Sequence, residues 1–441
     1  MAAFDSLDTR PRTPPLRPFP NPPENARVRA LLMGDAHGEL QVLAPERALV
    51  DVTALNAALG RQLRVRPHQA DEARSAVPGY YGVPTVVEES LLERRELALA
   101  TTEPGSFLRT RGRALPTGAV GATGVQRARF ARDVAGDPTP AARDGDRAAI
   151  HASLSRFTVL RLQQRLDETL HIPPLPEMAR RIIALQSDPS FPLRDLVEIV
   201  ETDPSVAARV MGWANSAFYN PDPPARSIHE AVVRVLGLDT VMSMALGMAL
   251  GQALRLPEAR TRGMPAFWLE AVTTAAAMEA LARRMPHRPS AGTSYVAGLL
   301  ANFGTLVLGH VFPPQYATIC LLQEANRHLP HTHVDHHVLA LPREVLAAAL
   351  LECWSLPAEV TDAVRFQYRP DHRGPSTSYV ALLRVSRKLL GTQGLTDHPP
   401  QPPEPAELAA LGLEQEDLQQ VLGLLHDCAD QLDRLAGSLG S

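Results

Sequence analysis

Five histidines lie within ten residues of this 441-residue chain, and the imidazole group of histidine can bind metals. The segment HLPHTHVDHH places them at positions 328, 331, 333, 336 and 337, with Asp335 between them. Imidazole and carboxylate groups are common ligands of transition metals. No helix is expected here to bring the rings to one face, so the stretch is interpreted as a polar surface loop. The alternative is a metal site formed by His331, His333, His336 and His337; no other metal site and no cofactor are expected.

The polar residues Asn215 and Ser216 are a further candidate site. They come directly after a predicted helix whose two ends are marked in the sequence. Asp203 can cap the first turn, and Pro204 suits the first helical position. Asn215 suits the left-handed residue that closes a helix, and Ser216 can cap the next segment of the chain. This architectural role is the favoured interpretation. The alternative is that both side chains bind a small ligand or a partner peptide.

The elements that position these residues fall into two groups, of which the first is mixed. Residues 1–25 are rich in Pro and Arg and are expected to form a disordered tail. Residues 26–115 are predicted to form a small α+β domain, with strands VRALLMGD and GELQVLAPE and a helix that ends at Gly60. Residues 116–148, rich in Ala, Gly and Pro, are predicted to be a linker.

The second group is helical throughout. From residue 149 onward the apolar residues have helical spacing, and no strand pattern competes. Residues 149–375 are predicted to form an all-α domain, and residues 376–441 a set of C-terminal helices. A Pro-rich break at Pro399–Pro405 precedes a last helix expected over Glu414–Leu435. The predicted fold class is therefore an α+β domain followed by an all-α domain.

Bulk composition limits the classes of function. The formal net charge of −4 gives no overall basic footprint for nucleic acid or an anionic membrane. The three cysteines have no metal-binding spacing, which is typical of a reducing compartment. The N-terminus lacks the apolar segment of a signal peptide, and the longest apolar run is far shorter than the roughly 20 residues of a membrane helix. We therefore expect a cytoplasmic bacterial protein.

The helical part resembles the HDOD domain. Between Pro173 and Tyr368 the chain carries, in the order and spacing of that family, IPPLPEMARRIIAL, DPSVAARVMGWANSAFYN, IHEAVVRVLGLDTV, FWLEA, VAGLLANFGTLVL and LLECWSLPAEVTDAVRF. The resemblance implies a fold related to the HD and HD-GYP metal-dependent phosphohydrolases. In those enzymes histidine and aspartate side chains on helices hold metals that activate water.

At the positions of those metal ligands this chain has residues of other types. The His-Asp pair of the family motif falls on Ala301-Asn302. The other histidines fall on Glu270 or a neighbour, on Arg343, and on Gln367-Tyr368. The resemblance and these losses together imply a domain without HD-type catalysis, and a residual phosphohydrolase is the alternative.

The N-terminal domain resembles the YbaK/prolyl-tRNA-synthetase-associated editing fold, an aminoacyl-tRNA deacylase family. The residues that carry this resemblance are VRALLMGDAHGELQVLAPERALVDVTALNAALGRQL and YYGVPTVVEESLLERRELAL. The resemblance implies a lysine near the first strand, where this chain has Arg27 and Arg29; its only lysine is Lys388. Arginine keeps the charge but is not a tunable amine. A degenerate editing-like domain is expected, and trans-editing without the lysine is the alternative.

These observations predict a non-catalytic signal-transduction protein, a pseudoenzyme that acts through an HDOD interaction module. The expected partners are other proteins, including a signalling component, with a nucleotide second messenger as a further candidate ligand. No catalytic residue is assigned. The side chains expected to contact a partner or ligand are Asn215, Ser216, Asn302, Arg343 and Gln367.

Overall fold

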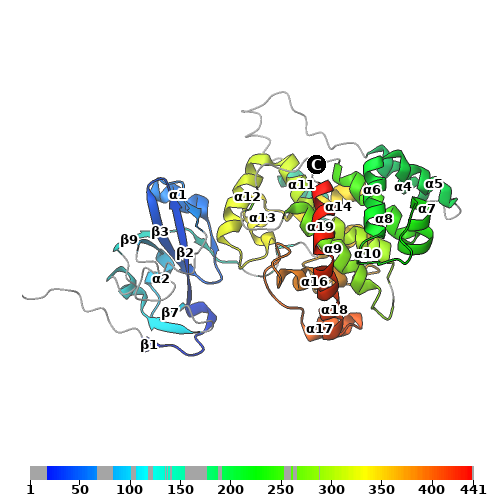
Figure 1. Cartoon of the computed structure of the whole chain (residues 1–441). Coiled ribbons are helices and arrows are strands. Elements are labelled where there is room, and N and C mark those ends of the chain that lie inside the picture. The colour runs from blue at the N-terminus through cyan, green and yellow to red at the C-terminus, as the bar shows by residue number, and fades with distance from the viewer. Residues whose placement is uncertain are drawn as a thin grey trace, which may run out of the picture. The chain divides into compact units, whose positions relative to one another are not determined.

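The computed structural model has two compact units, described here one at a time (Figure 1). Unit 1 comprises Met1–Gly136 and Cys320–Leu329, and unit 2 comprises Asp137–Ile319 and Pro330–Ser441. The structure describes residues 17–439 apart from the segments 67–82, 101–105, 118–122, 135, 137, 140–141, 154–175, 187–190, 253–259, 262–265 and 288. The predicted disorder of residues 1–16 lies outside the described residues.

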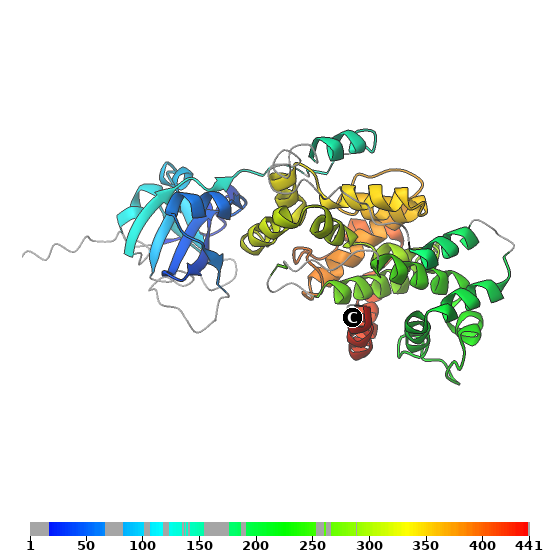
Figure 2. The ribbon, with the colours of Figure 1, turned by 90° about the horizontal axis from the view of Figure 1, so that it is seen from above.

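Unit 1 is built on a mixed sheet that curves strongly in Figure 2. Its strand order is β1-β8-β7-β2-β3-β6-β9, β5 also pairs with β2, and a small second sheet joins β10 to β4. Strands β2 and β3 form the predicted antiparallel hairpin, while β3 pairs with β6 in parallel. The strands are β1 (Arg17–Pro18), β2 (Arg27–Asp35), β3 (Gly38–Pro45), β4 (Leu49–Val50), β5 (Arg64–Val65), β6 (Pro84–Glu88), β7 (Leu97–Ala100), β8 (Phe107–Thr110), β9 (Thr123–Ala128) and β10 (Ala131–Arg132).

Much of the core of this unit comes from apolar residues of its strands. One buried cluster consists of the strand residues Val28, Leu43, Val87, Leu97 and Leu99 together with Leu91 and Leu115 from short helical turns. Helix α1 (Val52–Leu59) begins at Asp51, whose carboxylate accepts from the Ala54 backbone N–H, and ends at Gly60 with φ 64°. A left-handed φ of this kind favours glycine, so the predicted helix end is confirmed.

Two predicted boundaries of this region are wrong. Residues 17–25 are ordered, because β1 pairs with β8 and Phe19 is buried. The predicted linker 116–148 contains β9, which extends the sheet beside β6, and β10, which pairs with β4. The composition, rich in Ala and Gly, concealed both strands, because it has few of the β-branched and aromatic residues that are typical of strands.

Unit 2 is helical wherever the structure describes regular elements in it. A helical segment at residues 146–153 precedes the numbered helices. These are α4 (Glu177–Gln186), α5 (Leu193–Thr202), α6 (Pro204–Ala214), α7 (Ile228–Glu230), the π-helix η3 (Ala231–Leu236), α8 (Leu238–Gln252), α9 (Phe267–Ala282), α10 (Ala291–Leu299), α11 (Phe303–Val311), α12 (Pro313–Ala325), α13 (His331–Leu339), α14 (Arg343–Cys353), α15 (Ala358–Phe366), α16 (Thr377–Gly391), α17 (Pro405–Leu411), α18 (Gln415–Asp427) and α19 (Ala429–Leu439). The second half of α12 belongs to unit 1.

Helix α9 is the centre of unit 2. It is buried along almost its whole length and packs against α10, α16, α18 and α19. A helix that is apolar on every side requires neighbours all round it. The stretch Ala291–Val311 is long and apolar enough to cross a membrane, but 83% of its most apolar window is buried inside the fold. Burial of that extent is typical of a core helix.

The C-terminal region differs from its prediction at two places. The segment after Pro399–Pro405 begins with a further helix, α17, whose first residue is Pro405. The single last helix predicted over Glu414–Leu435 is two helices, α18 and α19, which meet at Cys428. Its apolar spacing continues across the break, because both helices turn a buried face to α9, and periodicity alone could not reveal the interruption.

Candidate functional site

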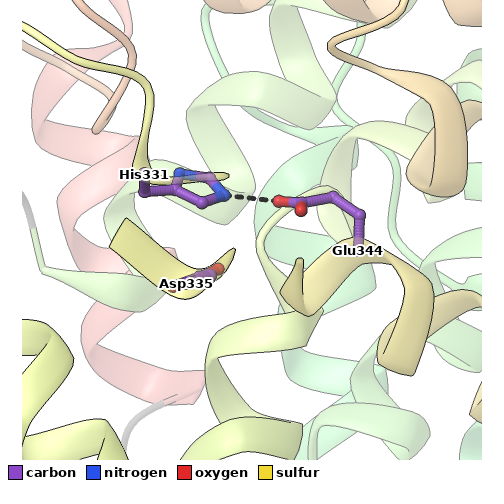
Figure 3. A group of neighbouring side chains, drawn as sticks. All are labelled: His331, Asp335 and Glu344. Atoms are coloured by element: carbon purple, nitrogen blue, oxygen red, sulfur yellow. Dashed lines mark hydrogen bonds and ion pairs between the residues drawn. The ribbon is translucent and has the colours of Figure 1, made fainter. Parts of the chain in front are cut away.

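The imidazole of His331 lies between two carboxylates in the interior of unit 2. Its Nε2 is 2.5 Å from Glu344 Oε1, at the start of α14, and its Nδ1 is 2.9 Å from Asp397 Oδ2, in the segment after α16. Figure 3 shows the ring facing the Glu344 carboxylate, with Asp335 of the same helix beside it. The consecutive helices α13 and α14 and the more distant segment after α16 thus meet at one side chain.

Helix α13 brings His331 to this position, which corrects the predicted surface loop. Its apolar and polar residues at helical spacing, His331, Val334, Asp335 and Leu339, are all buried. Histidine is a weak helix former, and the polar composition concealed this pattern. His336 and His337 lie on the exposed side of the helix. The four histidines of the predicted metal site therefore do not share one face, and His331 instead approaches acidic side chains.

Arg343, predicted to contact a ligand, is buried in a two-bond ion pair. Its Nε and Nη2 donate to the two oxygens of Asp335 over 2.6 and 2.7 Å, and its Nη1 donates to Thr305 Oγ1 over 3.1 Å. Burial lowers the pKa of Arg343, but the Asp335 carboxylate outweighs it and holds that pKa well above its usual value. Paired guanidinium–carboxylate bonds fix the two groups geometrically as well as electrostatically.

A second buried arginine, Arg387 of α16, joins the same network from the other side. Its Nη2 lies 3.1 Å from Glu270 Oε1 and also pairs with Asp397. Burial and the Asp397 charge raise the pKa of Glu270 to about 7, although Arg387 opposes this. Burial and Arg343 lower the pKa of His331, but the carboxylates of Glu344 and Asp397 prevail and raise it to about 9. With that pKa the imidazole carries a proton near neutral pH.

Asn302 and Gln367, the other candidates in this region, use their amide nitrogens on backbone carbonyls. Asn302 Nδ2 donates to Phe267 O over 3.1 Å, and Gln367 Nε2 donates to Ala301 O over 2.9 Å. Their amide oxygens are buried without a hydrogen-bond partner among the described residues. The ring of the adjacent Tyr368 packs edge-on against His331, with 5.1 Å between ring centroids. The positions where the HDOD resemblance expects metal ligands therefore do converge in space.

Asn215 and Ser216 take no part in this network. The Asn215 side chain donates to Ala225 O over 2.9 Å and accepts from the Ala225 N–H over 2.7 Å, so it closes the loop after α6. Its φ is −94°, which corrects the predicted left-handed conformation; the positive φ of 41° occurs at Asn220. Ser216 is buried. The contacts of Asn215 match the architectural interpretation of its side chain.

In unit 1, the guanidinium of Arg29 is engaged within the unit. Its Nη1 donates to Ala325 O over 2.8 Å and lies 2.7 Å from His328 Nδ1. Asn326 binds beside it, accepting from the Val50 N–H over 2.7 Å and donating to Val50 O over 2.9 Å. The residue expected at the editing lysine thus caps the C-terminal end of α12, where a positive charge is favourable.

Sequence reasoning missed Glu344, Asp397 and Arg387. Glu344 is the neighbour of Arg343, and the four-residue spacing of His331 and Asp335 was a signal that could have located the acidic cluster. Asp397 gave no local signal, since it lies in an irregular segment far along the chain. The potential ligand atoms of His331, Asp335 and Glu344 all lie within 4.8 Å of one another. Among the described residues these three are therefore the side chains placed to hold a metal ion.

The comparisons with known proteins agree with the helical fold. Residues 172–370 match the HDOD domain family. A protein of known crystal structure from Marinobacter aquaeolei VT8, named "Putative signal transduction protein", has 36% sequence identity to this chain. The two structures superimpose with a TM-score of 0.83. That match covers 97% of this chain and 96% of the Marinobacter chain. It therefore includes both units.

Two further relatives cover less of the chain. An HDOD domain protein with unknown function from Geobacter sulfurreducens is 18% identical with a TM-score of 0.51, over 66% of this chain and 99% of its own, which shows the fold alone. An uncharacterized protein of Treponema pallidum (strain Nichols) is 25% identical over 233 residues, or 52% of this chain. The chain spans 44% of the length of that curated relative.

Proposed function

Because this chain contains an HDOD domain and belongs to the same family as the Marinobacter aquaeolei protein, we propose that it is a regulatory signal-transduction protein without catalytic activity of its own. The observation that carries the proposal is Arg343. This guanidinium occupies a position where the HD enzymes have a metal ligand, and it is held there by both oxygens of Asp335. A fixed cation cannot donate a lone pair to a metal.

The remaining positions of the HD ligand set support the same proposal. Ala301 has no donor atom, and the amide nitrogens of Asn302 and Gln367 are used on backbone carbonyls. Tyr368 packs its ring on His331. Burial holds the pKa of the Tyr368 hydroxyl well above the usual value. A neutral phenol binds metals far less readily than imidazole. The arrangement therefore favours a rigid module over a hydrolytic centre.

Unit 1 enters the proposal as a degenerate editing-like domain that takes part in regulation. An editing mechanism requires a basic group free to position the charged tRNA end. The Arg29 guanidinium is engaged by Ala325, His328 and Asn326. Protein partners, including a signalling component, and a nucleotide second messenger are the proposed ligands.

Hydrolysis assays on the full chain test the absence of catalysis. The protein would be incubated with cyclic dinucleotides in the presence of Mg²⁺, Mn²⁺ or Zn²⁺, and separately with mischarged tRNA. We expect product at the level of the buffer blank in both assays. Cyclic dinucleotide turnover that disappears in Asn302→Ala, or deacylation that disappears in Arg29→Ala, would refute the proposal.

Binding measurements test the regulatory part. Titration calorimetry with a nucleotide panel would show saturable heat if a second messenger binds, and no heat for any member would remove that ligand class. For protein partners, candidates cross-linked to the chain in its host would be purified and titrated against it. A regulatory role requires at least one partner that binds the purified chain saturably.

A further inference from the structure

We propose that His331, Glu344 and Asp335 form a binding site for one divalent transition-metal ion of the zinc class, separate in its donors from the HD ligand set. None of the three stands at a position that the HDOD resemblance assigns to a metal ligand. Their ligand atoms lie within 4.8 Å of one another, and all three side chains are buried (Figure 3). The proposal concerns ion binding and does not depend on whether the protein is catalytic.

The first observation is the orientation of the imidazole. Asp397 Oδ2 lies 2.9 Å from His331 Nδ1, which leaves Nε2 directed at Glu344. Histidines that bind metals almost always donate the second ring N–H to a carboxylate or carbonyl, because this fixes the ring and raises the basicity of the other nitrogen. Asp397 and His331 form such a pair, in which the Asp397 carboxylate binds Nδ1 and leaves Nε2 for an ion next to Glu344.

The second, independent observation is an oxygen that lacks a partner. Glu344 is 3% exposed, and its Oε2 has no hydrogen-bond partner among the described residues. A carboxylate oxygen buried in this way is costly unless a donor or a cation satisfies it. An ion beside His331 Nε2 that is bound by both oxygens of the Glu344 carboxylate would satisfy it.

The third observation is a shortage of fixed positive charge. The network contains four carboxylates, on Asp335, Glu344, Asp397 and Glu270, and two guanidinium groups, on Arg343 and Arg387. Formal neutrality therefore requires two more positive charges. One divalent ion supplies both. The arginines thus compensate only part of the acidic charge.

The geometry can accept an ion with small side-chain movements. Donors of a tetrahedral zinc site lie about 2.0–2.1 Å from the ion, which places them roughly 3.4 Å apart. His331 Nε2 and Glu344 Oε1, now 2.5 Å apart, would separate by about an ångström. Asp335 can remain paired with Arg343: its Oδ2 accepts from the backbone N–H and Nε of Arg343, whereas its Oδ1 accepts, among the described residues, only from Nη2 and keeps a lone pair for the ion. One imidazole and two carboxylates suit zinc better than magnesium or calcium, which prefer oxygen donors alone.

Metal titration with matched variants tests the site. Tag-free full-length protein would be stripped with a chelator and titrated with Zn²⁺ in competition with a chromophoric chelator. We expect one equivalent per chain. His331→Gln and Glu344→Gln should weaken binding at least tenfold. Asp397→Asn, which removes the negative charge that orients His331 and pairs with Arg387, should weaken it by about 10- to 100-fold. His336→Gln, on the exposed side of the same helix, is the matched control and should bind like the wild type.

A measurement on the wild type alone protects the test from variants that fail to fold. X-ray absorption of the zinc-loaded protein should show one imidazole among nitrogen and oxygen donors at about 2.0–2.1 Å. Two or more imidazoles would assign the ion to the exposed histidines and overturn the proposal. Absence of saturable binding would also overturn it, leaving protons as the occupants. Equal affinity in His331→Gln, Glu344→Gln and His336→Gln would have the same meaning.

Discussion

Arg343 forms a buried ion pair in the interior of unit 2. Replacing it by Met keeps much of its volume but leaves Asp335, which is 0% exposed, without its two charge-assisted bonds. Removing one partner of a buried ion pair costs about 3–5 kcal/mol, because the remaining charge is uncompensated. We expect Arg343→Met to lower the free energy of unfolding by that amount in urea denaturation.

The control for Arg343→Met is a surface pair. Arg194 and Asp195 form an exposed ion pair in α5, with 86% of the Arg194 side chain exposed. Arg194→Ala should change the free energy of unfolding by less than about 1 kcal/mol. If the two substitutions lowered the free energy of unfolding equally, the buried Arg343–Asp335 pair would stabilise the protein no more than an exposed pair does.

Glu279 gives a pH dependence at the residue scale. This buried carboxylate accepts from Tyr219 Oη over 2.5 Å and from Arg283 Nη2 over 2.7 Å, yet burial outweighs both bonds and raises its pKa. A carboxyl whose pKa is raised on folding binds more protons in the native state. Its contribution to stability is therefore present at low pH and is lost as pH rises from the ordinary glutamate value through the raised one.

Glu279→Gln isolates this contribution, since an amide keeps the shape and does not titrate. We expect the stability of the wild type relative to Glu279→Gln to fall as pH increases through that window, measured by urea denaturation at a series of pH values. A difference that is constant, or that grows with pH, would contradict the assigned direction of the pKa.

At the scale of elements, the start of α6 is a local property of the sequence. The Asp203 carboxylate accepts from the Ser205 and Val206 backbone N–H groups over 2.8 and 3.2 Å, with Pro204 at the first helical position. Asp203→Ala should destabilise the protein by about 1 kcal/mol in thermal or chemical denaturation, because those donors lose their acceptor. Ser205→Ala, at an exposed position of the same turn, is the control and should have a smaller effect.

Elements with local signals could be predicted from the sequence, and elements defined by distant partners could not. The end of α1 at Gly60, the start of α6 at Asp203 and the β2–β3 hairpin depend on neighbours in the sequence, and the structure confirms them. Strand β9 exists because β6 offers an edge to pair with. Helix α13 is stabilised through Asp335 and His331, whose partners Arg343, Glu344 and Asp397 come from later segments. The same dependence explains why the ion network was not foreseen.

At the scale of the whole molecule, unit 1 is discontinuous in sequence. It takes in Cys320–Leu329, and Asn326 binds there as a strand would, with one hydrogen bond from Val50 N–H and one to Val50 O. Asn326 is fully buried and also receives Arg29 Nη2 over 3.4 Å. The side chain therefore connects β4 to a segment of the chain that follows Val50 by 276 residues.

Asn326→Ala should loosen this connection without altering the rest of the sheet. The Val50 N–H would become a buried donor without an acceptor, which costs about 1–3 kcal/mol and so increases its opening by roughly 5- to 150-fold. Hydrogen exchange followed by mass spectrometry would detect faster exchange in peptides containing Val50, while peptides from the middle of β3 stay protected. Arg47→Ala, an exposed change in the same unit, should leave both unchanged. Unaltered exchange at Val50 in Asn326→Ala would mean that unit 1 holds its β4 edge without the inserted segment, and the discontinuity would then have no energetic role.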